Sequence, residues 1–516
     1  MSVLSLTILG GHFFLLFILC LFGLHRLSMV WRGYKYKNVQ AIIPAKFKNL
    51  PKITVQIPLY NERFVAERII DAVAKFEYPR GQLQIQIVDD STDDTRQLVS
   101  ERVKHYQQLG INIEHVQRKN RQGYKAGALK EAMMAATGEF IAIFDGDFIP
   151  SSDLLTKTIH HFKEENSNMP VNERVAMVQF RWQHLNRASS ELTQVQAMML
   201  DAHFGLEQQV RYASKLLFNF NGTAGIWRTE AIIDAGHWSA DTLTEDLDLS
   251  YRAQLKGWKM VYLNDIECAG ELPANMNAFK SQQHRWAKGG VQVMKKMLPK
   301  VWRAKLPLTT KIEASFHLSN NLAYLVMLLD TLLFLVPSLV IRHHYQVSDT
   351  LWFDLPLLLL SSGGHLVYLF YGQVVLGRSK LFALSKLPRL LLLGIQLAIN
   401  NARAGIEALL GQESEFVRTP KDGELLIRNT ITEHRENKQK DKHKITVTAD
   451  DSIPFYRAVP PQGALIELLV ALVYSIVFGW IIWQQHWFMV PAVFILTLGF
   501  LTTSLNSLRS HYGLMR

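Results

Sequence analysis

The sequence predicts two kinds of fold in one chain: an α/β (Rossmann-like) domain and an α-helical transmembrane bundle. Strand-like and helical hydrophobic patterns alternate from about residue 50 to residue 300. Apolar stretches of about 20 residues, long enough to cross a bilayer, lie on both sides of that region. A hydrophobic content of 48% and a mean hydropathy of +0.03 agree with a water-exposed domain joined to several membrane helices. At 516 residues the chain is also too long for one ordinary core.

The first 27 residues are expected to form an N-terminal transmembrane helix. No basic segment precedes the apolar run and no small-residue cleavage site follows it, which disfavours a signal peptide. Four basic residues follow the apolar run, which covers residues 3–24: Arg26, Arg32, Lys35 and Lys37. Because basic residues mark cytoplasmic flanks, the N-terminus is expected outside and the next domain in the cytoplasm.

Residues 50–300 are predicted to form the α/β domain, ending in a helix that lies on the membrane surface. The expected strands are residues 53–59, 83–88, 111–116 and 140–144. The expected helices between them are residues 64–76, 95–109 and 125–136. Alternation at this spacing indicates a largely parallel sheet, in which ligands bind beyond the carboxyl ends of the strands. No GxGxxG or GxxxxGK[ST] motif is present, so dinucleotide and P-loop interpretations lack their fingerprints.

Two acidic motifs fall at predicted strand ends. Asp89 and Asp90 follow the second strand, and Asp145-Gly146-Asp147 follows the fourth. Two carboxylates one residue apart can bind a hard divalent ion and leave coordination positions for phosphate oxygens. An isolated Asp-Gly-Asp is more often a solvated turn, so it is the second acidic pair nearby that favours a metal site.

Two further polar motifs lie on predicted helices. Thr244 is a plausible cap for a helix over residues 243–255, where Glu245 and Asp246 follow; by itself this trio reads as a simple capping cluster. On a helix over residues 277–297, Arg285 offers a planar fork for diphosphate oxygens. The same helix presents the Gln282 amide and the flat Trp286 ring, and a salt-bridged surface helix is the alternative.

The rest of the chain is expected to return to the membrane. Two transmembrane helices are predicted within residues 313–376 and two within 463–507. Between them, residues 380–422 hold an interfacial amphipathic helix and a loop, because Arg403 would be costly to bury in a true span. Residues 423–461 form a polar cytoplasmic segment.

Composition excludes two other classes of function. The net charge of +11 is spread along the flanks of the apolar segments and is not clustered, so no nucleic-acid partner is expected. The two cysteines, Cys20 and Cys268, cannot build a disulfide scaffold or a thiolate metal site.

Taken in order, the motifs Asp-Asp, Asp-x-Asp, Thr-Glu-Asp and Gln-x-x-Arg-Trp resemble those of a family 2 processive β-glycosyltransferase. The chain is similar to cellulose synthase catalytic subunits and to cellulose-synthase-like mannan and glucan synthases. The resemblance covers about residues 50–300, and a weaker similarity is found near residues 413–422. Four segments support it: 56–62 (QIPLYNE), 120–129 (NRQGYKAGAL), 220–228 (FNGTAGIWR) and 282–289 (QQHRWAKG).

The resemblance implies a cytoplasmic GT-A catalytic domain and a role for each motif. Asp89 and Asp90 would contact the base and ribose of the nucleotide. Asp246 would be the general base beside Glu245. Asp145 and Asp147 would hold Mg²⁺ or Mn²⁺. Other contacts to the nucleotide sugar would come from Lys125, Asp145, Gln282 and Arg285. Contacts to the acceptor would come from Trp286 and Thr244. A gating-like loop would contain Phe416, Arg418, Thr419 and Lys421.

The expected activity is elongation, and translocation, of a β-linked polysaccharide of the glucan or mannan type by a membrane-embedded inverting enzyme. UDP-glucose or GDP-mannose is the expected donor, with the growing polysaccharide and the lipid bilayer as further partners. One alternative is a non-processive enzyme that adds one sugar to a lipid. Another is a transporter or binding scaffold without catalysis. The expected location is the cell (inner) membrane, with the Golgi membrane as the alternative.

Overall fold

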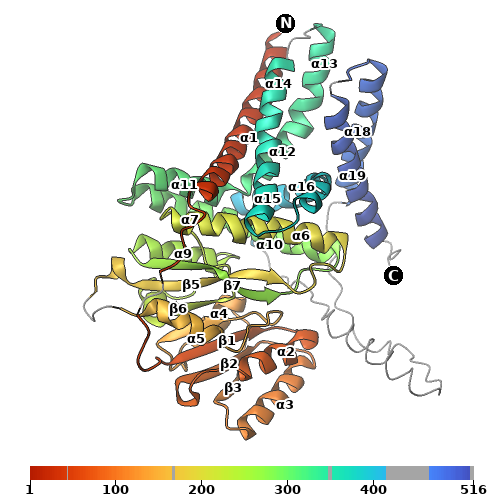
Figure 1. Ribbon diagram of the computed structural model, residues 1–516. Coiled ribbons are helices and arrows are strands. Elements are labelled where there is room, and N and C mark those ends of the chain that lie inside the picture. Colours follow the sequence, from red (N-terminus) through yellow and green to blue (C-terminus); the bar gives the residue numbers. More distant parts are fainter. Residues whose placement is uncertain (43–44, 165–168, 347–350, 414–463, 488, 512–516) are drawn as a thin grey trace, which may run out of the picture.

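The computed structural model describes residues 1–42, 45–164, 169–346, 351–413, 464–487 and 489–511. Figure 1 shows three levels: a sheet with its helices at one end, a band of helices in the middle, and upright helices at the other end. The predicted gating-like loop and the polar segment at 423–461 lie outside the described residues.

A seven-stranded mixed sheet forms the centre of the α/β domain, in the order β3-β2-β1-β4-β6-β5-β7. All neighbours pair in parallel except β6, which is antiparallel to both β4 and β5. The strands are β1 (Ile53–Leu59), β2 (Leu83–Asp89), β3 (Ile113–Gln117), β4 (Phe140–Ile143), β5 (Val175–His184), β6 (Gly225–Arg228) and β7 (Lys259–Gly270). The largely parallel sheet is confirmed, although the sequence predicted only its first four strands.

The register of the sheet brings the two acidic motifs to one edge. Leu59, the last residue of β1, pairs with Asp89, the last residue of β2. On the other side of β1, Gln56 pairs with Ile143, so β4 ends two residues before Asp145. Both motifs therefore follow parallel strands that run in the same direction.

Helices cover both faces of the sheet. One apolar core joins it to α2 (Arg63–Ala74), α3 (Thr95–Gln108) and α5 (Leu154–Thr158). A second core joins it to α4 (Tyr124–Ala132), α8 (Thr229–Asp234) and α9 (Glu245–Leu255). Short 3₁₀ turns complete the domain: η1 (Arg80–Gln82), η2 (Ile159–Phe162) and η3 (Val171–Glu173). The first residue of α9 directly follows Thr244, so this helix carries the third motif to the sheet.

A band of helices separates the sheet from the upright helices. It holds one continuous helical run, α6 (Glu191–Asp201), η4 (Ala202–Gln208) and α7 (Gln209–Ala213), in which η4 has π-helical geometry. The other members are α10 (Met276–Arg303), α11 (Leu308–Ser319) and α16 (Lys380–Leu409). One apolar cluster joins α6, η4 and α10 to Met29 of α1 (Val3–Lys35) and Tyr368 of α15 (Gly364–Val375), so the band packs directly on the upright helices.

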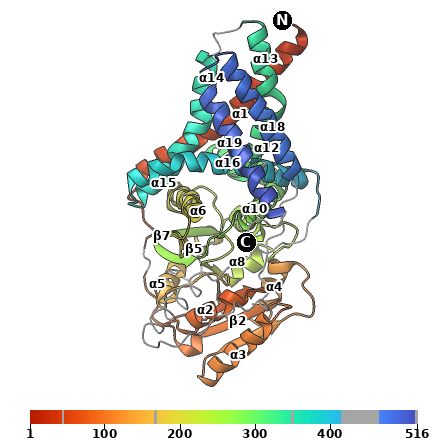
Figure 2. The same ribbon diagram turned by 90° about the vertical axis from the view of Figure 1, so that its right-hand side faces the viewer.

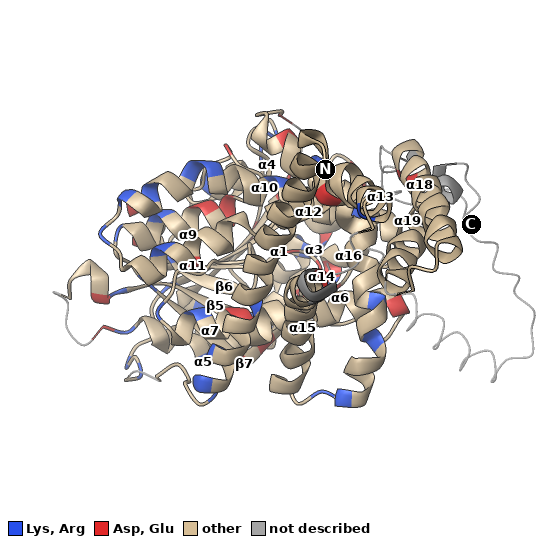
Figure 3. Cartoon of the chain, turned by 90° about the horizontal axis from the view of Figure 1, so that it is seen from above, with Lys and Arg blue, Asp and Glu red and all other residues tan. Residues whose placement is uncertain are grey.

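Among the residues that the structure describes, six helices are long and apolar enough to cross a membrane. They are α1 (Val3–Lys35), the run α12–η5–α13 (Leu322–Leu329, Asp330–Leu335, Val336–His344), the run α14–η6–α15 (Leu351–Leu358, Leu359–Gly363, Gly364–Val375), α16, α18 (Ala464–Trp483) and α19 (Val490–His511). Seen along the upright helices, these are mostly tan, whereas the blue and red segments that mark charged residues lie mostly on the surrounding elements (Figure 3).

The helix α16 stands apart from the other five because of its direction. It is seen nearly end-on in Figure 1 and runs across the molecule in Figure 2, whereas α18 and α19 stand upright in both. It contacts α10 and α6 of the middle band. Length and composition would allow it to span, so the interfacial position stays a prediction, and this crosswise direction is what supports it.

Candidate active site

One pocket gathers the polar motifs at the edge of the sheet beneath α10. It is lined by residues from β1, the turns after β2 and β4, α4, the loop before β6, α9 and α10. All but one of the predicted site residues that the structure describes line it: Asp90, Lys125, Asp145, Asp147, Thr244, Glu245, Asp246, Gln282, Arg285 and Trp286. Motifs spread over about 200 positions of the chain therefore meet in one place.

The turn Asp145-Gly146-Asp147 is held from two sides. The backbone N–H of Asp145 donates to Thr223 Oγ1 at 2.8 Å. A Cβ at Gly146 would lie 2.2 Å from Glu62 Oε2, so only glycine allows the Glu62 carboxylate to approach this closely. Asp147 is 5% exposed, and its Oδ2 accepts from the backbone N–H of Glu271 at 3.2 Å. The turn presents two carboxylates from a fixed backbone.

Lys125 joins the acidic turn to the loop before β6. Its Nζ lies 2.6 Å from Asp145 Oδ1 and donates to the Gly222 carbonyl at 2.9 Å. Burial acts to lower the pKa of Lys125, but the carboxylates of Asp145, Glu245 and Asp246 outweigh burial and raise it. The ammonium is therefore charged, and it can offset negative charge on a bound phosphate.

Glu245 and Asp246 form an acidic pair at the first turn of α9. Burial and the neighbouring Glu245 carboxylate raise the pKa of Asp246 to about 7. Burial also raises the pKa of Glu245, against the opposing effect of Lys125. The backbone N–H of Leu247 donates to Asp246 Oδ1 at 2.8 Å, which orients that carboxylate. A carboxylate that titrates near neutral pH suits a general base.

The predicted capping role of Thr244 is wrong. Thr244 is the N-cap residue by position, yet its side chain makes no capping hydrogen bond, and its buried Oγ1 has no hydrogen-bond partner among the described residues. The physical reason is packing: a Cβ at Gly289 of α10 would lie 2.6 Å from Thr244 Cγ2 and 2.8 Å from Oγ1. Thr244 instead fills the contact between α9 and α10.

The third part of the pocket is α10, which presents the Gln-x-x-Arg-Trp motif. Asn275 caps this helix by accepting from the backbone N–H of Ala278 at 2.9 Å. Burial lowers the pKa of Arg285, whereas Glu245, Asp145, Asp246 and Glu62 act to raise it. Arg285 therefore lies close enough to both acidic motifs to feel their charge. A diphosphate bound between the two motifs would lie beside this guanidinium.

Gly222 occupies the centre of the site, and a larger residue would be strained at this position. Its φ of +80° is a left-handed conformation, and a Cβ there would lie 3.0 Å from Asp246 Oδ2 and 3.5 Å from Lys125 Nζ. We expect Gly222→Ala to lower kcat by about tenfold or more, because displacements of about 1 Å at a reacting centre are that costly. Steady-state transfer assays would measure this loss.

The matched control for that prediction is Gly257→Ala. Gly257 has φ +100°, and a Cβ there would come no closer than 3.6 Å to another residue, Asn172. This variant carries the backbone strain of about 1 kcal/mol without touching the pocket. Equal loss of activity in both variants would show that strain alone explains the effect and would contradict the role given to Gly222.

Asp89 is the predicted site residue that does not line the pocket, and its contact with the nucleotide stays a prediction. It is fully buried, with Oδ2 2.8 Å from His115 Nε2 and Oδ1 accepting from the backbone N–H of Ser91 at 2.9 Å. Both oxygens are thus occupied within the protein, and Asp89 shapes the turn. Asp90 does line the pocket, and Arg118 binds both of its oxygens.

Several pocket residues were not singled out from the sequence. Arg121 lies over the Tyr60 ring at 3.3 Å, which places a cation and an aromatic face in the wall. Both fall inside segments quoted for the resemblance, so position within those segments could have found them. Trp182, His184 and Glu271 come instead from β5 and from the residue after β7, two strands that the sequence did not reveal.

The charge of the pocket favours a bound cation. Seven carboxylates and three Lys or Arg side chains line it. Arg118 pairs with Asp90 and Arg68 pairs with Glu271, which leaves five of the carboxylates against the three basic side chains. A diphosphate would be repelled by this remaining excess of negative charge unless a cation lay between them. Among the described residues no three His, Cys, Asp or Glu side chains are grouped as metal ligands. Asp145 and Asp147, together with phosphate oxygens, match the ligands that Mg²⁺ usually takes in proteins, which are one or two carboxylates plus phosphates.

Comparison with known proteins decides the class of this domain. Residues 51–289 match the family described as "Glycosyltransferase like family 2". This segment is a family 2 glycosyltransferase domain. The match confirms the family predicted from the polar motifs, and it covers β1 through much of α10.

The glycosyltransferase domain has close relatives among plant enzymes. "Glucomannan 4-beta-mannosyltransferase 2" from Arabidopsis thaliana is 41% identical over 278 residues, which are 53% of this chain and 51% of the relative. "Glucomannan 4-beta-mannosyltransferase 1" from Oryza sativa subsp. japonica is 43% identical over 259 residues, 49% of this chain and 48% of the relative. The chain thus matches about half the length of these curated relatives.

A solved structure confirms the GT-A fold of the glycosyltransferase domain. A mannosyltransferase from Pyrobaculum calidifontis, solved in complex with GDP-Man and Mn²⁺, matches with a TM-score of 0.52. It is 19% identical in sequence, and the match covers 78% of this chain and all of that one. At this identity the likeness concerns the fold alone.

Proposed function

We propose that the chain is a membrane-embedded inverting glycosyltransferase that extends a β-linked polysaccharide of the mannan or glucan type. GDP-mannose is the favoured donor, because the relatives at 41% and 43% identity are named mannosyltransferases. The observation that carries the proposal is the single pocket in which Asp145, Asp147, Lys125, Asp246 and Arg285 meet.

In this proposal Asp246 carries the chemistry of transfer. Its carboxylate would take the proton of the acceptor hydroxyl as that oxygen bonds to the anomeric carbon of the sugar. The bond from the anomeric carbon to the diphosphate oxygen breaks on the opposite face, which inverts the configuration. Gly222 leaves room for this attack, since no side chain stands between its backbone and Asp246.

Basic and aromatic groups complete the site. Lys125 and Arg285 would bind the diphosphate and offset the charge that develops on it as it leaves. A divalent ion held by Asp145 and Asp147 would supply further stabilisation of that charge. Trp286 would offer its flat face to the pyranose ring of the acceptor, with Gln282 one turn before it on α10.

Polymer extension is favoured over the single-sugar alternative. The relatives carry the name of a polysaccharide, glucomannan, in their own names. The pocket also lies under α10, and α10 packs against α11 and α16 below the upright helices. A growing chain that leaves Trp286 would therefore move toward helices that can form a membrane path.

The described helices favour a multi-pass membrane protein with the catalytic domain in the cytoplasm. We place it in the cell (inner) membrane, as predicted from the sequence, and fractionation of the native cells would separate this from the Golgi alternative. The expected cytoplasmic side follows from Arg26, Arg32 and Lys35 near the end of α1 that enters the catalytic half.

The test is transfer by the full-length protein in nanodiscs with Mn²⁺ or Mg²⁺. Radiolabelled GDP-mannose, UDP-glucose and UDP-N-acetylglucosamine are supplied in parallel. High-mass labelled product from GDP-mannose, digested by a β-mannanase, is the expected result. Label found only in an organic-extractable glycolipid would support the single-sugar alternative and contradict the proposal.

A further inference from the structure

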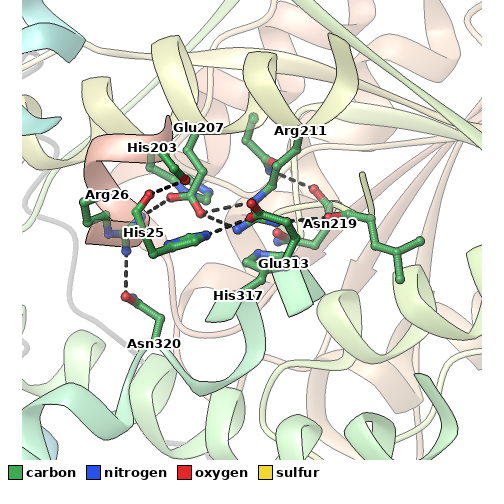
Figure 4. Close-up of polar contacts among 12 residues, drawn as sticks. His25, Arg26, His203, Glu207, Arg211, Asn219, Glu313, His317 and Asn320 are labelled. Atoms are coloured by element: carbon green, nitrogen blue, oxygen red, sulfur yellow. Dashed lines mark hydrogen bonds and ion pairs between the residues drawn. The ribbon is translucent and has the colours of Figure 1, made fainter. Parts of the chain in front are cut away.

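A buried network of charged residues lies where the first membrane helix meets the catalytic domain (Figure 4). It joins residues of α1, η4, α7 and α11 with the loop that precedes β6. Its labelled members are His25, Arg26, His203, Glu207, Arg211, Asn219, Glu313, His317 and Asn320. Buried charges are costly unless they are well paired, so a network of this size calls for an explanation.

Glu207 is the hub of the network. Its Oε1 accepts from Arg211 Nε at 3.1 Å and Nη2 at 3.0 Å. Its Oε2 accepts from Arg26 Nη1 of α1 at 2.9 Å and from the Tyr368 hydroxyl of α15 at 3.0 Å. Burial would raise the pKa of Glu207, but Arg26 and Arg211 hold it well below its ordinary value. One carboxylate thus ties two membrane helices to the catalytic domain.

The hub reaches the active-site loop through the π-helical turn that carries it. His203 Nδ1 lies 3.5 Å from Glu207 Oε2, and His203 Nε2 lies 3.0 Å from Asn221 Nδ2. Gln208 Nε2 donates to Asn221 Oδ1 at 2.6 Å and to the Asn219 carbonyl at 2.9 Å. Because Gln208 requires the oxygen of the Asn221 amide, the amide nitrogen must donate to His203 Nε2. Asn221 is therefore fixed in one orientation, and π-helical turns often occur at functional sites.

The residues that follow Asn221 form the centre of the active site. The Gly222 carbonyl accepts from Lys125, and its Cα faces Asp246. The Thr223 hydroxyl accepts from the backbone N–H of Asp145. A shift of Asn221 would consequently move the contacts of the base, the lysine and the metal-binding turn together.

A second branch runs from α1 to the helix that carries the base. His25 Nε2 lies 2.8 Å from Glu313 Oε2, and Arg32 Nη2 donates to Glu313 Oε1 at 2.9 Å. Glu313 lies on α11, one turn before His317, whose Nδ1 is 2.7 Å from the Tyr251 hydroxyl of α9. Both branches start on α1, and both end on elements that position Asp246.

We propose that His203 and Glu207 are positioning residues for sugar transfer, and that Arg26 makes their position depend on the first membrane helix. The network holds the Asn221–Gly222 backbone in the place that the base and Lys125 require. The inference rests on the proposed function, because its catalytic consequence needs Asp246 to be the base. It assigns α1 a part in the active site in addition to anchoring the chain.

His203 offers the sharpest test because its side chain is 27% exposed, against 6% for Glu207, so its replacement disturbs less buried structure. His203→Leu removes the acceptor for the Asn221 amide, whereas His203→Gln keeps an amide oxygen near the place of Nε2. In nanodiscs we expect His203→Leu to lower kcat by about tenfold or more, with the donor KM changed by less than about twofold. His203→Gln should recover most of the rate, and His105→Leu on the exposed face of α3 should match the wild type.

Hydrogen exchange supplies a readout that does not need activity. Backbone amides of the loop are hydrogen-bonded: Phe220 donates to Ser250 Oγ at 2.9 Å and Asn221 to Gln179 Oε1 at 3.0 Å. In His203→Leu, and in Arg26→Gln compared with Arg26→Lys, amides of residues 219–224 should exchange several-fold faster. Amides of α2 and α3 should not change.

Each outcome decides one proposal. If the wild type makes no product from any donor, the proposed function fails, and loop exchange alone decides the positioning role. Unchanged loop exchange in His203→Leu would overturn that role, as would equal kcat loss in His203→Leu and His203→Gln. Unchanged loop exchange in Arg26→Gln would overturn the part assigned to α1.

Discussion

Asp246→Asn is expected to lower the rate of sugar transfer by about 10² to 10⁴-fold, the usual contribution of a general base. Asparagine keeps the shape of the side chain but cannot accept the proton of the acceptor hydroxyl. The donor should still bind, because Lys125, Arg285 and the Asp145-Gly146-Asp147 turn are unchanged. Radiolabel transfer and equilibrium binding of GDP-mannose, measured on the same preparation, would separate the two effects.

The control for this prediction is Asp241→Asn. Asp241 is an exposed aspartate five residues before Asp246, and its partner Lys296 keeps a second contact to Asp248 at 2.8 Å. It should transfer sugar at the wild-type rate. An Asp246→Asn protein with the same rate as Asp241→Asn would remove Asp246 from the role of base.

The raised pKa of Asp246 also sets the sign of the pH dependence. The base must be deprotonated, so kcat should fall about tenfold per pH unit below about pH 7, the value to which burial and Glu245 raise this pKa. An unperturbed aspartate would instead keep its activity down to about pH 4. Replacing Glu245 by Gln should move the fall in kcat to lower pH, because one of the two causes of the shift is removed.

The helices and strands that could be predicted from the sequence are those whose own residues carry a clear hydrophobic pattern. β1, β2 and β4 are short apolar runs, and α2 and α3 carry helical periodicity, so each was placed to within about two residues. Because β1, β2 and β4 run in parallel, placing Asp90, Asp145 and Asp147 at their carboxyl ends also placed them near one another. The Gln-x-x-Arg-Trp motif joins them because its helix, α10, returns to the same edge of the sheet.

What the sequence could not reveal depends on contacts between distant segments. Asp89 and Asp90 are adjacent, and only the fold shows that His115 of β3 takes Asp89 into the interior. Thr244 is a residue type that commonly caps helices, but Gly289 of α10 packs against its side chain. β5 and β7 were missed, and Trp182 and His184 with them, because charged and polar residues interrupt their apolar pattern. His203 and Glu207 belong to no motif, and their importance follows from Arg26, which is 181 positions away from Glu207.

The second large effect is expected at the acidic turn Asp145-Gly146-Asp147, which is proposed to bind the metal ion. Asp145→Asn should weaken the Mn²⁺-dependent binding of GDP-mannose by at least about 100-fold, since loss of a metal's outer partners alone costs 10- to 100-fold. The excess of carboxylates in the pocket is the physical reason: without the cation, no positive charge would separate the diphosphate from the acidic lining residues Glu62, Glu245 and Asp246. Titration calorimetry with and without Mn²⁺ would measure the difference.

Asp153→Asn is the matched control, because Asp153 lies in the same segment six residues beyond Asp147 but outside the pocket. It should bind the donor and respond to Mn²⁺ as the wild type does. In Asp145→Asn, Lys125 keeps its contact to the Gly222 carbonyl, so residual binding that no longer depends on Mn²⁺ is expected from the basic groups. If Asp145→Asn and Asp153→Asn respond alike to Mn²⁺, the ion binds elsewhere, and the acidic turn serves the shape of the sheet edge instead.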